Sequence, residues 1–184
     1  AQAWHTEEIR SVRPTPVDEA RWGFSVIENS LWEAVPDFMR ELDGRLNEDY
    51  EVSLPLDASP VQFSSWMGGD RDGNPFVTSK VTEQVLLLAR KRAAKLFAID
   101  LDRLQVELSM YDCNDALREK VGDANEPYRA LLRPLVDKFI ATRDGISDYL
   151  AGKNPDTSNW VESDDELIEP LMLCYQSLLD CGMQ

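Results

Sequence analysis

The fold is organised around the stretch SSWMGGDRDGNP, which occupies residues 64–75. Its adjacent glycines, Gly68 and Gly69, permit backbone conformations that larger residues rarely adopt. They are followed by Asp72-Gly73 and Asn74-Pro75, two dipeptides that are typical of tight turns. Because no other stretch concentrates so many residues with special backbone properties, we predict an irregular, functionally interesting loop here.

The residues on either side of this loop predict regular structure. Val61-Gln62-Phe63 is a short β-prone run, which predicts a strand at residues 61–66. After the loop, Thr78 or Ser79 is suited to cap a helix, and apolar residues then recur at helical spacing. The region 61–90 is therefore predicted to be a strand, a charged loop and a helix.

The charged part of the loop allows two interpretations. In the first, the glycines only turn the chain between two elements. In the second, a ligand approaches the glycine backbone, and Arg71 binds an anion while its guanidinium is held between Asp70 and Asp72. The spacing fits neither the dinucleotide fingerprint nor the Walker loop. With Arg71 between the two carboxylates and no other acid close in sequence, a metal site is not expected there.

Composition and charge narrow the class of protein. The 184 residues are 43% apolar and 29% charged, which fits one ordinary soluble domain or part of a larger one. A net charge of −15 argues against a nucleic-acid partner, because phosphates would be repelled. The longest apolar runs are too short to span a membrane. The chain has no signal peptide and no initial Met, so we expect an internal segment of a longer, cytoplasmic protein.

Side chains able to perform catalysis are few. The three cysteines, Cys113, Cys174 and Cys181, form no CxxC pair and have no neighbouring histidine. A zinc site is therefore not expected, and reduced cytosolic thiols fit best. The single histidine, His5, would have to serve a Ser-His-Asp triad from the very start of the chain. We therefore expect an exposed or partner-facing histidine at position 5 rather than a member of a catalytic triad.

Most of the remaining chain has helical periodicity. Thr15 is predicted to cap a first helix that has Pro16 at its first position. Pro36 should break or kink this helix, whose apolar stripe continues to Leu46. The long helix after residue 79 is expected to be interrupted near Asp100.

Three further helices are predicted in the second half. Asn114 should cap a short helix that ends at Gly122, and Pro127 should open a longer one with a kink at Pro134. A loop at residues 151–162 precedes the capping box Ser163-Asp164-Asp165-Glu166, which should open the last helix. The predicted class is mainly α, with one or two short strands near residues 61–66.

The sequence FSSWMGGDRDGNP at residues 63–75 closely resembles a signature stretch of the phosphoenolpyruvate carboxylase family. The resemblance covers essentially the whole chain and is closest to the bacterial branch. One departure is Phe76, where many members of the family carry a polar or basic residue. Further matching segments are WHTEEIR (4–10), RPTPVDEA (13–20), ENSLW (28–32), VP (35–36), LLL (86–88), ELS (107–109), EPYR (126–129), EPL (169–171) and CYQSL (174–178).

The resemblance implies a longer enzyme, of which residues 1–184 are a single internal segment. Its members are large, mostly helical proteins built around an eight-stranded barrel, and are usually cytosolic homotetramers. They carboxylate phosphoenolpyruvate with bicarbonate to oxaloacetate and phosphate, using Mg²⁺ or Mn²⁺. In that chemistry a histidine deprotonates carboxyphosphate, arginines hold the anions and the metal stabilises the enolate.

The resemblance also implies that this chain lacks the catalytic machinery. The motifs T-A-H-P-T and G-Y-S-D-S-x-K are absent, His5 does not match the first, and no metal is expected to bind this segment. The family's metal acids, mobile glycine-rich loop and aspartate-inhibitor site are expected in other parts of its sequence. We therefore expect the isolated segment to be inactive.

What carries over is a part of the substrate site. Trp32 matches a tryptophan of the apolar pocket near the substrate methylene, and the loop matches a segment on the active-site side of the barrel. The residues expected near the substrate, or orienting its neighbours, are Trp32, Gly68, Gly69, Asp70, Arg71, Asp72 and Asn74. The alternative is a non-catalytic α-helical module that binds a partner or an anion through the same loop.

Overall fold

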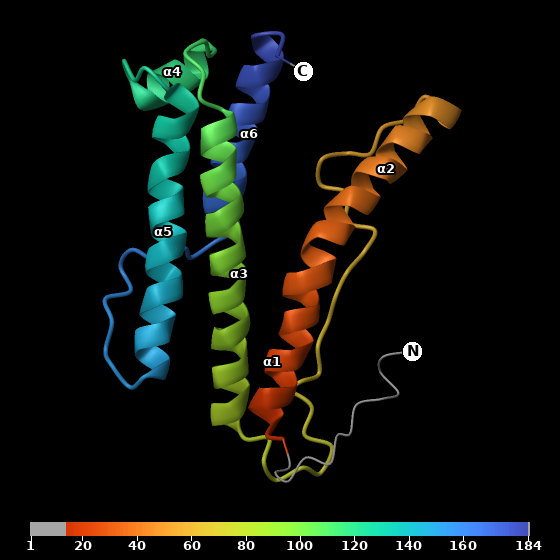
Figure 1. Ribbon diagram of the computed structural model, residues 1–184, viewed down its shortest axis with the longest axis vertical. Helices are drawn as coiled ribbons and strands as arrows, with labels where there is room; N and C mark the ends of the chain where they lie inside the picture. The colour runs from red at the N-terminus through yellow and green to blue at the C-terminus, as the bar shows by residue number, and fades with distance from the viewer. Residues whose placement is uncertain (1–13, 184) are drawn as a thin grey trace. The chain divides into compact units, whose positions relative to one another are not determined.

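The computed structural model describes residues 14–183, so the predictions about His5 and the segment 4–10 lie outside it. The described residues form helices joined by loops, with no strand among them, which confirms the mainly α class (Figure 1). No helix in this part of the chain is both long enough and apolar enough to cross a membrane. The chain divides into two compact units, residues 1–86 and 87–184, which are described separately.

The first unit begins with α1 (Pro16–Val26), whose N-terminus forms as the sequence predicts. The backbone N–H of Asp18 donates to the Thr15 hydroxyl, and the Asp18 carboxylate accepts from the Thr15 backbone N–H at 3.2 Å. This reciprocal capping box satisfies two donors that an uncapped helix would leave free. Pro16 occupies the first turn, where its missing N–H costs no hydrogen bond.

Of the break or kink predicted at Pro36, the break does not occur. A π-helical segment, η2 (Ile27–Leu31), leads directly into α2 (Trp32–Tyr50), and α2 runs through Pro36. Proline removes one hydrogen bond from the ladder, the one that the Trp32 carbonyl would accept, and the wider π turn ends at Leu31, one residue before that carbonyl. The helix then continues to Tyr50, beyond the predicted end at Leu46, and Glu51 closes it in the left-handed conformation with φ 56°.

The strand predicted at residues 61–66 is absent, so this prediction was wrong. These residues have no regular secondary structure and are all exposed, including Val61, Phe63 and Trp66. A β-prone run becomes a strand only when another strand pairs with its backbone, and residues 14–183 provide none. The predicted strand–loop–helix of residues 61–90 is therefore an extended segment, a loop and the start of α3 (Ser79–Glu107).

The second unit contains the rest of α3 together with α4 (Asp115–Val121), α5 (Pro127–Leu150) and α6 (Asp165–Asp180). Figure 1 shows α3, α5 and α6 running alongside one another. Asn114 caps α4 and Gly122 follows it with φ 67°, both as predicted, whereas α3 continues through Asp100 without the expected interruption. The buried core consists of Ala94, Ala98, Leu101, Leu117, Tyr128, Leu132, Leu135, Val136, Phe139 and Cys174.

The connection from α5 to α6 is held against the second unit by Trp160. Its ring covers Gly145, where an added Cβ would lie 2.7 Å from Cε2, and the Arg90 guanidinium lies 5.5 Å from the ring centroid. Arg90 also donates to the Val161 carbonyl, and the Val161 N–H donates to the Thr142 hydroxyl. These contacts fix the end of a loop that has no regular structure of its own.

The capping box predicted at the start of α6 forms only on its glutamate side. The Glu166 carboxylate accepts from the backbone N–H groups of Glu162 at 2.8 Å and Ser163 at 3.4 Å. The N-cap residue is Asp164 rather than Ser163, and its side chain makes no capping bond. Glu166 also pairs with Lys138 of α5, and this pairing, together with the backbone hydrogen bonds from Glu162 and Ser163, lowers the pKa of the Glu166 carboxyl.

Candidate functional site

The loop begins with a turn in which the Trp66 carbonyl accepts two hydrogen bonds. It accepts from the N–H groups of Gly69 at 3.0 Å and Asp70 at 2.9 Å. Gly68, in the middle of this turn, has φ 72°, the left-handed conformation that a side chain disfavours. The left-handed backbone conformation of this turn thus favours glycine at position 68.

Two more turns follow, at the dipeptides that the sequence singled out. Asp72 and Gly73 have φ 35° and 75°, and the Asn74 N–H donates to the Arg71 carbonyl across them at 2.5 Å. The Asn74 side chain then accepts from the Phe76 N–H at 3.0 Å. Both turn predictions are confirmed, and the Asn74 amide stabilises the second of them.

The inner end of the loop is fixed by packing inside the first unit. The Thr82 hydroxyl of α3 donates to the buried Gly68 carbonyl at 2.6 Å. Val85, also on α3, lies over Gly68 so closely that a Cβ added there would be 2.6 Å from its Cγ2. Met67 packs on Gly23 of α1, with its Sδ 2.7 Å from the position of an added Cβ. Residues of α1 and α3 therefore both contact the base of the loop, at Met67 and Gly68.

The outer end of the loop carries exposed charged side chains that have no partner among residues 14–183. Asp70, Arg71 and Asp72 are exposed, and no hydrogen bond or ion pair joins their side chains to any other described residue. The predicted clamping of the Arg71 guanidinium between the two carboxylates is therefore not formed. The arrangement leaves Arg71 available to an anion.

Exposed aromatic rings flank these charges. Trp66 is 79% exposed, Phe76 66% and Phe63 57%, so the loop presents apolar surface as well as charge. The sequence did not single these rings out as site residues. A single exposed apolar residue needs no explanation, but several beside an unpaired arginine form a surface suited to contact with another molecule or chain segment.

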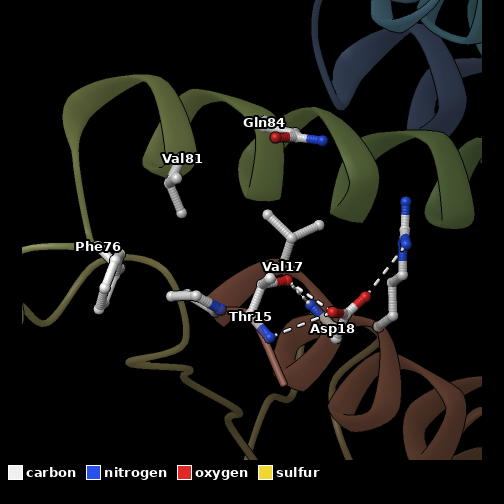
Figure 2. Close-up of a pocket in the computed structure, with 8 residues that line it drawn as sticks. Thr15, Val17, Asp18, Phe76, Val81 and Gln84 are labelled. Atoms are coloured by element: carbon white, nitrogen blue, oxygen red, sulfur yellow. Dashed lines mark hydrogen bonds and ion pairs between the residues drawn. The ribbon is translucent and has the colours of Figure 1, made fainter. Parts of the chain in front are cut away.

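A hollow of about 420 Å³ opens beside the loop, within the first unit (Figure 2). Phe76, Val81 and Gln84 face it from one side and Thr15, Val17 and Asp18 from the other; Pro16 and Arg21 complete the lining. No sequence signal identifies this hollow, because the residues of its two walls are far apart in the chain.

The charge of this hollow does not suit an anionic substrate. Hydrogen bonds from the Thr15 hydroxyl and backbone lower the pKa of Asp18, so its carboxylate is charged at neutral pH. The Arg21 guanidinium lies 3.3 Å from the same carboxylate and is occupied by it. None of the predicted site residues lines the hollow. Trp32, the first residue of α2, is half-buried elsewhere in the unit.

The described residues do not fit a divalent metal ion. Within residues 14–183, no group of three or more His, Cys, Asp or Glu side chains is arranged to hold one. The three cysteines are free thiols, and burial raises the pKa of Cys174 to about 11. The site therefore consists of a fixed glycine turn, an arginine whose side chain has no partner among the described residues, and exposed aromatic rings.

Comparison with known proteins shows which family this chain resembles over its whole length. The family described as "Phosphoenolpyruvate carboxylase" matches residues 1–184. A phosphoenolpyruvate carboxylase of Pseudomonas putida (strain GB-1) is 58% identical over 183 residues, and that of Aeromonas hydrophila is 58% identical over 182. That of Chromohalobacter salexigens is 60% identical over 185 residues. The matches cover 99–100% of this chain and 21% of each relative, so the chain spans about a fifth of their length.

Proposed function

This chain belongs to the phosphoenolpyruvate carboxylase family, and from that membership we propose that it is one internal segment of a carboxylating enzyme. The longer protein would join phosphoenolpyruvate and bicarbonate to give oxaloacetate and phosphate. The observation that carries this proposal is the match over all 184 residues to enzymes of which the chain covers only 21%. Activity and substrates accordingly belong to the longer protein.

Within that enzyme, we propose that the loop at residues 68–74 forms one wall of the substrate site. Both substrates are anions, and an arginine without a protein partner can offer them two parallel N–H donors. The exposure of Arg71, whose side chain pairs with no residue in the described range 14–183, supports this role, as does the anchoring of the loop base at Gly68. Asp70, Asp72 and Asn74 would orient neighbouring groups and hold the turns.

We also propose, on family membership alone, that Trp32 contributes to the apolar pocket near the substrate methylene. The Mg²⁺ or Mn²⁺ ion and the catalytic histidine would be supplied by parts of the longer protein outside this chain, since neither T-A-H-P-T nor G-Y-S-D-S-x-K occurs in it. A cytoplasmic homotetramer is the assembly that we expect for the whole enzyme.

The 184-residue chain alone should show no carboxylation. One wall of a site cannot place a base, a metal and both substrates in reacting geometry. The measurement is a coupled assay in which the oxaloacetate formed is reduced by malate dehydrogenase, with the full-length enzyme as the positive control. Oxaloacetate production by the isolated chain above the rate of a reaction without protein would overturn this prediction.

A further inference from the structure

We propose that Thr82 is a positioning residue for the carboxylation reaction, because its hydroxyl holds the peptide plane from which the charged loop extends. The inference rests on the function proposed above for residues 68–74. Thr82 is not part of the glycine-rich motif and lies 14 residues from its partner Gly68.

The Thr82 hydroxyl lies near two carbonyl oxygens, and the Gly68 carbonyl is the one that depends on its hydrogen bond. Its hydroxyl lies 2.6 Å from the Gly68 carbonyl and 3.2 Å from the Thr78 carbonyl. The Thr78 carbonyl already accepts from the Thr82 backbone N–H at 3.0 Å, so the helix does not depend on the hydroxyl. Gly68 is buried, and its carbonyl would lose this donor in a variant without the hydroxyl.

One rigid peptide plane links this bond to the loop turn. The Gly68 carbonyl and the Gly69 N–H belong to the same planar amide. Thr82 holds its oxygen, and the Trp66 carbonyl holds its N–H at 3.0 Å. Because glycine flanks this amide on both sides, side-chain sterics do little to prevent it from rotating. The two hydrogen bonds therefore set the direction in which the chain continues towards Arg71.

Val85 supports the same arrangement from the next turn of α3. Residues three apart on a helix share a face, so Thr82 and Val85 reach Gly68 together. Val85 is 5% exposed and covers the Gly68 Cα, leaving no room for a side chain. The Thr82 hydroxyl thus sets the direction of the Gly68 carbonyl, and the Val85 isopropyl group fills the space next to the Gly68 Cα.

The test compares Thr82→Val with Thr82→Ser in the full-length enzyme. Thr82→Val keeps the shape and removes the donor, whereas Thr82→Ser keeps the donor. Loss of one such hydrogen bond should raise amide exchange at Gly69 and Asp70 about fivefold and lower kcat/KM by a similar factor. Thr82→Ser should restore both quantities to within about twofold. Thr82→Ala, which removes the donor with a better helix former, should behave as Thr82→Val does.

The outcomes separate this inference from the proposed function. Unchanged exchange at Gly69 and Asp70 in Thr82→Val and Thr82→Ala would overturn it, as would faster exchange with unchanged kcat/KM. Equal loss of exchange protection throughout α1 and α3 would indicate general destabilisation and would also overturn it. A fully active Arg71→Ala enzyme would refute the proposed role of the loop, while the exchange data would still show whether Thr82 holds Gly68.

Discussion

Replacing Arg71 with alanine should lower kcat/KM of the full-length enzyme about 10- to 100-fold, because charge-assisted hydrogen bonds contribute about 1.5–3 kcal/mol. The Arg71 side chain makes no hydrogen bond or ion pair with any other described residue, so the fold should lose little when the side chain is removed. The loss should therefore appear in steady-state kinetics with phosphoenolpyruvate and bicarbonate, and thermal unfolding should hardly change.

Two further variants make the Arg71 experiment specific. Arg71→Lys keeps the charge but loses the planar fork, so it should recover only part of the activity. Arg40→Ala removes an exposed arginine of the same unit whose partner is Asp37 on the helix surface, and it should stay within about twofold of the parent enzyme. Full activity of Arg71→Ala would mean that the loop has only a structural role.

Replacing Gly68 with alanine should destabilise the first unit by about 2–5 kcal/mol. The left-handed φ of 72° costs an L-residue about 1–2 kcal/mol. The added Cβ would lie 2.6 Å from Val85 Cγ2, and such overpacking typically costs about 1–3 kcal/mol more. The loss can be measured as the opening free energy of amides in residues 14–86, from native-state hydrogen exchange on the full-length enzyme.

Gly73→Ala provides the matched control for this substitution. Gly73 has nearly the same backbone conformation, with φ 75°, but nothing lies within 4 Å of an added Cβ. This variant should therefore cost only the backbone term, about 1–2 kcal/mol. The difference between the two variants measures the contact with Val85, and equal losses would contradict the close packing at Gly68.

Local signals in the sequence predicted local structure well. The caps at Thr15 and Asn114 depend on residues three or four apart, and both form. The turns at Asp72-Gly73 and Asn74-Pro75 are likewise decided within four residues. Such features follow from the conformational preferences of a few neighbouring residues, and tertiary packing does not override them here.

Features that depend on distant partners were not predicted. The run at residues 61–66 has the composition of a strand, but the part of the chain that the structure describes offers no second strand to pair with it. The adjacent charges of Asp70, Arg71 and Asp72 suggested an ion pair that the turn geometry does not form. The contact of Thr82 with Gly68 joins two elements, and no spacing rule identifies it. The loop could therefore be located from the sequence, but its anchoring could not.

Substrate protection of the loop tests the central claim most directly. Amide exchange of a peptide covering residues 66–75 should be measured in the full-length enzyme, with and without saturating phosphoenolpyruvate. If the loop forms one wall of the substrate site, exchange at these amides should slow severalfold when substrate binds, and Arg71→Ala should weaken that protection. Identical exchange with and without substrate, in an enzyme shown to be active and saturated, would contradict the claim.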